Sequence, residues 1–596
     1  EYVAAIINGE QGPTVNVAAF GSRELTPILQ LKYGRDRIDW IEWASDERLL
    51  IAASESDIVN GDRIRVSRLF SIRRDGKGLE QIERKALGDI PWWTYIFDTT
   101  RVVHYLPDDP KHILLQIYDD RDEAFAVYRV NIEKNRFEKL FVNSYNVGSW
   151  HANLKGEVVL RVERDKDLVK FWHRPDPNAD WQVIREVELF ESETFDPILV
   201  DGNEAIVVSD HDLGRQALWR YDIAAGEFVE LLFAAEGRDI EGAILSPDDD
   251  EVIGAIYYDD YRVDEYFDAK HAAEANLVKS SFPQYQTAIV SRSLDGKRMI
   301  VLASRDNSPD KYFWLDLGSK AGGIGFSQYS YFEQAPLAAV EPFDLQTEDG
   351  LTLRGYLTMP TAAGAAKPPL VVMPHGGPQS RDYRYFDPYV QFLANRGYAV
   401  LQVNFRGSTG FGNALEVAGY RQWGTGMQND VYAAIDWLAG RDVVDMDRVC
   451  FVGGSYGGYV ALTAAFQRPT AYRCHVALAP VSDLVAQAEA SYRWDNYKAF
   501  VRRTMGDPTD AADKAMLEAN SPIDNLRLIK TPILLVHGTY DTQVRVQQSR
   551  DFVKQAERAG IDIEYLELDT GTHYFDEYAN RLRVFEAIET FLAEHL

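Results

Sequence analysis

Cysteine, positive charge and long apolar runs are all scarce in this chain of 596 residues. The two cysteines, Cys450 and Cys474, are too few for a disulfide framework or a cysteine-based zinc site. Both lie in apolar, strand-like runs, which favours buried thiols; a bridge stays open as the alternative if the two runs are neighbouring strands. No stretch of 18 or more apolar residues is present, so we expect no insertion into a membrane.

The scarcity of positive charge argues against polyanionic binding partners. Lys and Arg total 63 against 92 Asp and Glu, which gives a net charge of -29 and a pI near 4.8. Such a chain repels nucleic acid and anionic membrane surfaces, so we expect neither as a partner. No His, Cys and carboxylate spacing typical of a metal site occurs, and no Gly-rich phosphate loop follows a strand, so we predict no metal and no cofactor. The oligomeric state stays open, a homo-oligomer included.

The chain begins at Glu1 rather than Met. We therefore expect that an upstream piece was removed or left out, and a secretory signal is one such piece. The compartment stays open between the cytoplasm and the periplasm or exterior.

Residues 1–335 are rich in short alternating strands and Asp-containing turns, which is typical of an all-β domain. A turn followed by an apolar strand recurs there at successive spacings of 63, 46, 46, 48 and 46 residues. The six copies are 46–51, 109–114, 155–160, 201–206, 249–253 and 295–300. A period in the forties with several strands per unit predicts a β-propeller with room for a seventh blade; a β-sandwich array is the alternative.

Residues 336–596 alternate strands with helices, which predicts a mostly parallel sheet covered on both faces, the architecture of an α/β-hydrolase domain. A hairpin with its turn at Asp349-Gly350 precedes it. The expected strands are 370–373, 399–405, 449–452, 475–479, 533–536 and 563–568. The expected helices are 389–395, 430–439, 459–467, 547–559 and 583–594. At this length, two large domains or three ordinary ones are expected.

The segment Gly453-Gly-Ser455-Tyr-Gly457 lies between an apolar strand and a helix-prone run. This arrangement is typical of a nucleophile elbow, in which glycines flank a serine because a Cβ would collide with neighbouring backbone. The serine hydroxyl then projects beyond the sheet edge, and the following N–H groups begin a helix where negative charge is favoured. We predict Ser455 as a nucleophile; a tight structural turn is the alternative.

The chain order of an α/β-hydrolase triad is Ser, acid, His, which restricts the base. Of the eleven histidines, only His573 and His595 lie beyond position 540, and His595 ends a terminal helix. His573 follows the expected strand 563–568, so we predict it as the base. Asp541 follows the expected strand 533–536 and is the preferred acid; Asp483, one strand earlier, is the alternative.

An oxyanion hole needs two N–H donors for the developing negative charge. The residue after the nucleophile, Tyr456, supplies one in such elbows. For the second donor we predict the Gly377 N–H in Pro374-His-Gly-Gly-Pro378, with the Gly376 N–H as its alternative. A structural turn without a catalytic role is the other interpretation of this segment.

Other polar residues near these motifs rank lower. His375 and His537 precede Asp541 in the chain, so structural hydrogen bonding is favoured over proton transfer. The acidic run 259–265 could bind a substrate ammonium if it faces the propeller interior, but a solvated loop is the more usual role.

These motifs resemble the prolyl oligopeptidase family of serine peptidases, in particular its acylaminoacyl-peptidase-like branch. The matching segments are 375–378, 403–412, 423–424, 428–430, 453–458 and 537–541. The resemblance covers the whole chain and implies Ser455, Asp541 and His573 as the triad. It also implies a seven-bladed, unclosed propeller that caps the active site, so that short peptides enter and folded proteins do not.

The chain departs from the family pattern at two places. Many members have an Arg two residues after the acid, where it holds a substrate carbonyl; Gln543 stands here and resembles the amide of dipeptidyl peptidases. The Glu-Glu pair by which dipeptidyl peptidases bind a free amino terminus is not identifiable. The resemblance places the S1 pocket near 492–497, so Trp494 and Tyr497 are expected to contact an apolar substrate residue; ordinary packing is the alternative.

The main hypothesis is therefore a serine peptidase that acts on short peptides through an acyl-enzyme. An esterase or isopeptidase uses the same constellation and is the first alternative. A non-enzymatic propeller scaffold with a vestigial hydrolase is the second, and the intact Ser455, Asp541 and His573 oppose it.

Overall fold

The computed structural model describes all residues except 33–35, 60–61, 85–99, 120–123, 142–146, 191, 248–250, 330–331, 333–334, 362–365 and 493–494. The described residues form two compact units. Unit 1 contains Glu1–Ser209, Leu218–Leu232 and Asp576–Ala579, and unit 2 contains Asp210–Ala217, Phe233–Phe575 and Asn580–Leu596.

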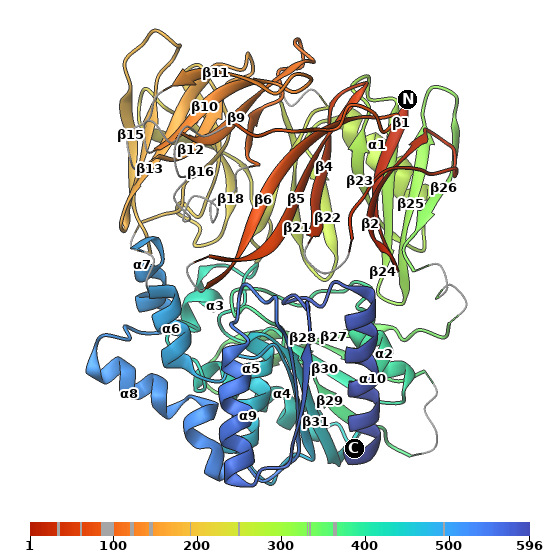
Figure 1. Ribbon diagram of the computed structural model, residues 1–596, viewed down its shortest axis with the longest axis vertical. Coiled ribbons are helices and arrows are strands. Elements are labelled where there is room, and N and C mark those ends of the chain that lie inside the picture. Colours follow the sequence, from red (N-terminus) through yellow and green to blue (C-terminus); the bar gives the residue numbers. More distant parts are fainter. Residues whose placement is uncertain are drawn as a thin grey trace. The chain divides into compact units, whose positions relative to one another are not determined.

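The N-terminal region is a seven-blade β-propeller, as the repeat predicts, and each blade is an antiparallel sheet (Figure 1). Blades one to three are β1 (Tyr2–Gly9), β2 (Gly12–Ala19) and β3 (Thr26–Gln30), then β4 (Asp36–Ser45), β5 (Arg48–Val59), β6 (Asp62–Arg73) and β7 (Glu80–Gln81), then β8 (Val102–His104), β9 (His112–Asp119), β10 (Ala124–Asn131) and β11 (Arg136–Phe141). Blades four and five are β12 (Val147–Ala152), β13 (Val158–Asp165), β14 (Leu168–His173) and β15 (Gln182–Glu188), then β16 (Asp196–Asp201), β17 (Glu204–Ser209), β18 (Ala217–Asp222) and β19 (Glu227–Phe233). Blades six and seven are β20 (Ile240–Leu245), β21 (Val252–Tyr258) and β22 (Arg262–Tyr266), then β23 (Gln286–Arg292), β24 (Arg298–Arg305), β25 (Ser308–Asp316) and β26 (Ala321–Ser327), with helix α1 (Ala269–Ser281) between them.

Consecutive blades share apolar clusters. In unit 1, Leu50 and Leu69 of the second blade pack with Leu115 and Ala126 of the third, and all four are at most 2% exposed. Burial of both faces of a sheet requires a neighbour on each side, which is the physical basis of the repeat.

The C-terminal α/β domain, which lies in unit 2, is built on one eight-stranded sheet of order β27-β28-β30-β29-β31-β32-β33-β34. Its strands are β27 (Val340–Gln346), β28 (Thr352–Thr358), β29 (Pro369–Val372), β30 (Ala399–Val403), β31 (Asp445–Gly454), β32 (Cys474–Leu478), β33 (Ile533–Gly538) and β34 (Ile563–Leu568). β27 and β28 form the antiparallel hairpin that the sequence predicts around Gly350. From β29 and β30 to β34 all neighbours pair in parallel, so the loops that follow these strands share one edge of the sheet (Figure 1).

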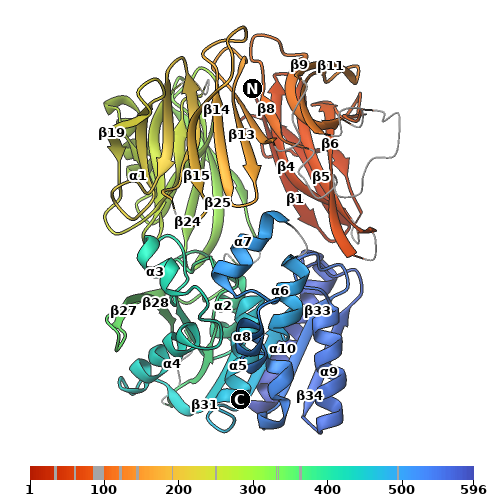
Figure 2. The same ribbon diagram turned by 90° about the vertical axis from the view of Figure 1, so that its left-hand side faces the viewer.

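Helices cover both faces of this sheet, as the alternating pattern predicts. They are α2 (Pro388–Asn395), α3 (Asn413–Ala418), α4 (Gly426–Ala439), α5 (Tyr456–Gln467), α6 (Leu484–Tyr492), α7 (Asp495–Thr504), α8 (Ala511–Ala519), the 3-10 helix η3 (Pro522–Leu528), α9 (Gln547–Ala559) and α10 (Tyr578–His595). Successive strand residues alternate between the faces: Leu370 and Val372 pack with α4 and α5, whereas Val371 packs with α2 and α10. Figure 2 shows these helices beside the strands.

The last strand of the seventh blade ends at Ser327 and the first strand of the α/β sheet begins at Val340. The boundary between 335 and 336 lies in this interval and stays a prediction. The terminal helix α10 begins at Tyr578, five residues earlier than the sequence predicts.

Cys450 and Cys474 face each other in the parallel pair of β31 and β32, with their Cα atoms 4.8 Å apart, and their sulfurs form a disulfide. The interpretation as two free buried thiols is therefore wrong. The register of two parallel strands, which local sequence does not contain, brings the side chains together.

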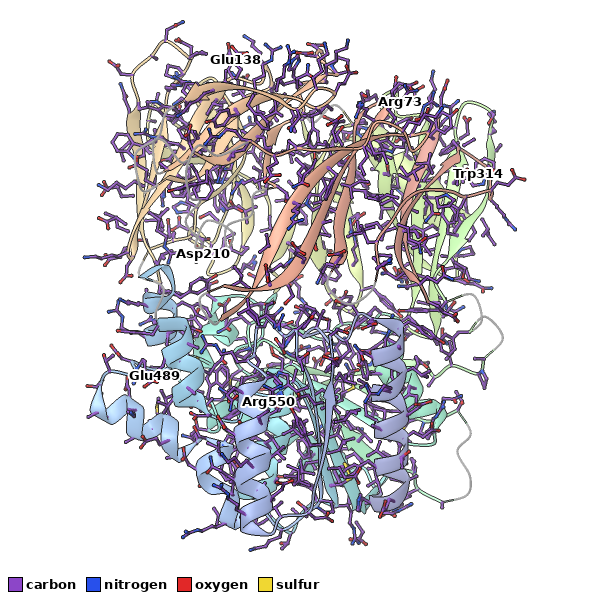
Figure 3. All side chains as sticks on the ribbon, in the orientation of Figure 1. Arg73, Glu138, Asp210, Trp314, Glu489 and Arg550 are labelled. Atoms are coloured by element: carbon purple, nitrogen blue, oxygen red, sulfur yellow. A yellow bond between two sulfur atoms is a disulfide. The ribbon has the colours of Figure 1, made fainter. Side chains whose placement is uncertain are left out.

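The edge strand β34 is tied to helix α9. Arg550, labelled in Figure 3, donates hydrogen bonds of 2.9 and 2.7 Å to the two carboxylate oxygens of Glu567. This bidentate geometry is specific for a guanidinium and a carboxylate. It restrains the strand from which the loop of His573 leaves.

Among the described residues, no helix has the length and apolar character needed to cross a membrane.

Candidate active site

Ser455 stands at a sharp turn between strand β31 and helix α5, at the edge where the parallel strands end. Its backbone has φ 57° and ψ -119°, a conformation that a residue with a side chain rarely adopts and that costs about 1–3 kcal/mol. The Ser455 N–H donates to the Leu478 carbonyl at 2.8 Å, which pins the turn to the neighbouring strand. The serine is half-buried.

The glycines around Ser455 are required by close backbone contacts. A Cβ on Gly453 would lie 2.2 Å from the Gly457 carbonyl oxygen, and one on Gly457 would lie 2.1 Å from the Pro374 carbonyl oxygen. Both distances are shorter than any van der Waals contact, so only glycine fits. The elbow predicted from the sequence is present.

Asp541 and His573 meet at the same sheet edge, in the loops that follow β33 and β34. The Nδ1–H of His573 donates to Asp541 Oδ2 at 2.6 Å. The carboxylate is fully buried and the imidazole is 7% exposed. The two loops are also joined through their backbones, since Tyr540 donates to the Gly571 carbonyl at 2.8 Å. A Cβ on Gly538 would lie 2.1 Å from that carbonyl oxygen, so the approach depends on glycine.

Three further N–H groups converge on the Asp541 carboxylate. Oδ1 accepts from the backbone N–H of Gln543 and Val544 at 2.8 and 2.9 Å. Oδ2 accepts from Nε2 of His537 at 3.1 Å, and that nitrogen also lies 3.0 Å from the Val544 carbonyl oxygen. Because both neighbours are acceptors, His537 must carry its proton on Nε2. Its Nδ1, 2.6 Å from Ser549 Oγ, accepts the hydroxyl proton when the ring is neutral.

This set of donors keeps Asp541 ionised. Burial raises the pKa of the carboxyl, but the hydrogen bonds from His537 and His573 outweigh it and hold the pKa at about 2. A carboxylate can only accept, so it fixes the Nδ1–H tautomer of His573. The Nε2 lone pair of His573 is thereby left available for a proton.

Ser455 is the third member of the predicted triad. Within the described part of the chain its hydroxyl makes no hydrogen bond, to His573 or to another side chain. Catalytic hydrogen bonds are often long or poorly aligned without substrate and shorten in the substrate complex. The acid–base pair is thus assembled, and the bond from base to nucleophile is not formed in this state.

The candidate oxyanion loop lies against the nucleophile. A Cβ on Gly376 would lie 3.5 Å from Ser455 Cβ, which places the loop beside the serine. Among the residues that the structure describes, neither the Tyr456 N–H nor the Gly377 N–H donates to a protein acceptor. The Tyr456 ring itself is buried, 1% exposed, and its hydroxyl lies 2.8 Å from Met427 Sδ, so only its backbone is a candidate for the site.

His375 and Asp483 have structural partners. His375 contacts Ser408 Oγ at 2.9 Å and stacks on Phe405 with ring centroids 4.3 Å apart. Burial lowers the pKa of His375 to about 4, so the ring is neutral near pH 7. Asp483 accepts from the Ala486 N–H at 2.9 Å, in the first turn of α6, and has no contact with His573 in the described structure. The geometry thus favours Asp541 as the acid.

The acidic run 259–265 is only partly solvated: Asp259 and Glu265 are exposed, as the prediction has it, whereas Asp260 and Asp264 are paired with arginines. The guanidinium of Arg354 donates to both carboxylate oxygens of Asp260 at 2.6–2.9 Å, and the Tyr356 hydroxyl donates to it at 3.2 Å. Asp264 is 6% exposed at its side chain and pairs with Arg262 at 2.7 Å. The Arg354 partner is 94 positions away, so the local run of charge gives no sign of it.

The structure describes two of the three residues predicted to contact substrate, Gln543 and Tyr497. Gln543 is exposed, and its Nε2 donates to the Tyr574 hydroxyl oxygen at 2.9 Å. Tyr497 lies on α7 with 55% of its surface exposed. Trp494 lies outside the described residues. Tyr574 was not among the predicted site residues; its position directly after the base was the available signal.

Comparisons with known proteins show the family and the fold of this chain. Residues 384–596 match the prolyl oligopeptidase family. Dipeptidyl aminopeptidase BIII of Pseudoxanthomonas mexicana is 30% identical over 514 residues, which are 84% of this chain and 73% of that protein. The acylamino-acid-releasing enzyme of Homo sapiens is 29% identical over 231 residues, 38% of this chain and 32% of that protein. A puromycin-hydrolyzing peptidase of Mycobacterium tuberculosis has the same fold, with a TM-score of 0.74 at 18% identity over 100% of this chain and 92% of that one.

Proposed function

Because the chain belongs to the prolyl oligopeptidase family of peptidases, we propose that it cleaves short peptides by serine catalysis. Ser455 is the nucleophile, His573 the general base and acid, and Asp541 the group that orients His573. The observation that carries this proposal is the 2.6 Å hydrogen bond from His573 to a buried, ionised Asp541. It lies at the sheet edge where the strained elbow presents Ser455.

Acylation begins when substrate brings Ser455 and His573 within hydrogen-bonding distance. His573 Nε2 takes the hydroxyl proton while Ser455 Oγ attacks the carbonyl carbon. The imidazolium that forms is stabilised by the negative charge of Asp541, which stays ionised. As the C–N bond breaks, His573 returns the same proton to the leaving amine, and the acyl group remains on Ser455 as an ester.

The tetrahedral intermediate carries its negative charge on the former carbonyl oxygen. We assign the N–H groups of Tyr456 and Gly377 to this oxygen, with the Gly376 N–H as the alternative to the latter. Both assigned donors lack a protein acceptor among the described residues, and the Tyr456 N–H begins helix α5, where the helix dipole favours an anion. One such donor contributes about 2.7–4 kcal/mol to transition-state stabilisation.

Deacylation repeats the steps with water. His573 removes a proton from water, the resulting hydroxide attacks the ester carbonyl, and Ser455 leaves as its alcohol after receiving that proton. The free acid and the resting enzyme are regenerated, so atoms and charge balance.

The proposed substrate class rests on similarity to one of the relatives that match most of the chain. Similarity to a dipeptidyl aminopeptidase over 84% of the residues favours peptides with a free amino terminus over N-acylated ones. Gln543, where many family members have an arginine, is consistent with this choice. From the family resemblance alone we also propose that the propeller restricts substrates to short peptides, and that Trp494 and Tyr497 contact the residue before the scissile bond.

The test is a Ser455→Ala variant assayed on a peptide library with free and N-acetylated amino termini. We expect kcat to fall about 10⁶-fold, with hydrolysis by the parent confined to short peptides that have free amino termini. Ser319→Ala, at an exposed serine, is the matched control. Hydrolysis by Ser455→Ala at the parental rate would refute the assignment, and cleavage of acetylated peptides alone would replace a dipeptidyl by an acylaminoacyl specificity.

An esterase with little peptidase activity uses the same three groups. Paired substrates with one acyl group and either an amide or an ester bond distinguish the two functions. We expect parental kcat/KM for the amides to be within the range of working enzymes, about 10⁴ M⁻¹s⁻¹ or above. A parent that hydrolyses only the esters would identify the esterase.

A further inference from the structure

Tyr574 directly follows the proposed base and is exposed although it is aromatic. Its surface is 59% exposed, and its ring stands edge-on to the His573 imidazole with centroids 5.3 Å apart at an interplanar angle of 85°. The phenol is held in place, since its oxygen accepts from the Gln543 amide at 2.9 Å. The backbone N–H of Gln543 in turn donates to Asp541 Oδ1.

The ring is therefore positioned by the catalytic acid as well as by its own chain neighbours. The loop after β33 supplies Asp541 and Gln543, and the loop after β34 supplies His573 and Tyr574. An isolated exposed aromatic side chain needs no explanation by itself. A ring that is fixed by a hydrogen bond beside a catalytic imidazole has lost rotational freedom without gaining burial, and a substrate that covers it would supply that burial.

The chemistry of acylation places the leaving residue of the substrate next to His573. His573 Nε2 must come within about 3 Å of the leaving nitrogen to give it a proton. The side chain of the leaving residue begins at the carbon attached to that nitrogen. A side chain of aromatic size extends far enough to reach a ring whose centroid is 5.3 Å from that of the imidazole.

We propose that Tyr574, positioned by Gln543, binds the side chain of the residue that leaves with the amine, and that it favours an aromatic or large apolar residue there. This inference rests on the proposed role of His573. It assigns a specificity-determining contact to the leaving side of the scissile bond, and it gives Gln543 a positioning role through Tyr574. The contact acts in acylation, because the leaving residue has departed before water attacks the ester.

The first experiment compares two peptide substrates with one acyl part and with phenylalanine amide or glycine amide as the leaving residue. For Tyr574→Ala we expect kcat/KM to fall about tenfold with phenylalanine and at most about twofold with glycine, since an aromatic contact is worth about that factor. Tyr574→Phe keeps the ring but loses the hydrogen bond from Gln543, so it should retain a preference between those of the parent and Tyr574→Ala. Equal losses on both substrates, or none, would overturn the proposal.

A second readout does not depend on how much of the variant is folded. The acyl-enzyme is formed from a p-nitrophenyl ester of the same acyl group, and phenylalanine amide or glycine amide is added to compete with water. The ratio of aminolysis to hydrolysis counts only molecules that have formed acyl-enzyme. Tyr574→Ala should lower this ratio about tenfold for phenylalanine amide relative to glycine amide, whereas Leu528→Ala, at an exposed side chain of η3, should leave it at the parental value.

The outcomes separate this inference from the proposed function. If Ser455→Ala retains hydrolysis, the proposed function fails, and the role of Tyr574 fails with it. If Ser455→Ala is inactive and Tyr574→Ala has the parental partition ratio, only the assignment of Tyr574 is wrong.

Discussion

Replacing Asp541 by asparagine should slow catalysis strongly, for a reason that the hydrogen bonds make explicit. The carboxylate accepts two backbone N–H groups on Oδ1 and two imidazole N–H groups, from His573 and His537, on Oδ2. Asparagine has one accepting oxygen and one NH₂ group. One pair of donors must therefore face the NH₂. His573 can exchange its Nδ1 donor for an acceptor by changing tautomer, whereas the backbone N–H groups cannot.

This substitution changes the tautomer of His573, the proposed base. With the NH₂ directed at His573, Nδ1 becomes the acceptor and the proton moves to Nε2, the atom that should take the proton of Ser455. We expect kcat to fall about 10⁴-fold, which corresponds to about 5.5 kcal/mol of transition-state stabilisation. The fold should persist, because a net hydrogen-bond loss of this kind costs about 1–3 kcal/mol.

The assay is kcat and kcat/KM on a peptide substrate for Asp541→Asn and for Asp483→Asn. The second variant is the matched control, since Asp483 is the other acid that the chain order allows and its carboxylate accepts from the Ala486 N–H. We expect a change below about twofold for it, because its carboxylate has no bond to His573 in the described structure. A kcat of Asp541→Asn within tenfold of the parental kcat would refute the reasoning. So would a loss of kcat in Asp483→Asn that exceeds the loss in Asp541→Asn.

Three further changes test the surroundings of the site. Gly457→Ala should prevent the elbow from forming, because its Cβ would lie 2.1 Å from the Pro374 carbonyl oxygen; activity at parental levels in a folded variant would contradict this. His537→Phe keeps an aromatic ring but removes a donor from Asp541, so we expect a loss of about 2 kcal/mol in the free energy of unfolding at pH 7, measured in urea, and a fall in kcat. Burial, with the charge of a nearby carboxylate, raises the pKa of the Asp382 carboxyl to about 8. Between about pH 4 and 8 the folded state therefore holds a proton that the unfolded state releases. The free energy of unfolding of the parent should fall by about 1.4 kcal/mol for each pH unit in this range. Asp382→Asn should remove this pH dependence, so the melting temperature of the variant minus that of the parent should increase from pH 5 to pH 8. A difference that stays constant over this range would contradict the raised pKa of Asp382.

The elbow and the triad candidates could be predicted because their signals are local or topological. The turn around Ser455 needs glycines at fixed offsets, and these are visible in one short segment. His573 and Asp541 follow from chain order once the sheet is known to be parallel, since every loop after a strand reaches the same edge. The blade period was visible for the same reason: each turn-and-strand unit repeats a local pattern.

The contacts that depend on side-chain register were not predictable. The pairing of Gln543 with Tyr574 joins two loops that separate strands bring together, and the pairing of Arg354 with Asp260 spans 94 positions. Composition could not reveal that Asp260 is paired, because it counts charges but not their distant partners. Cys450 and Cys474 were assigned as thiols because the sequence specifies two strands without their mutual register.

The central claim is that Ser455 and His573 act as one catalytic unit. A fluorophosphonate probe followed by mass spectrometry of the peptide that carries residue 455 measures this directly, because the probe reacts with an activated serine. The account predicts a single adduct on Ser455 in the parent and a labelling rate lower by a factor on the order of 10³ or more in His573→Ala. No adduct on Ser455, or labelling at the parental rate without His573, would contradict it.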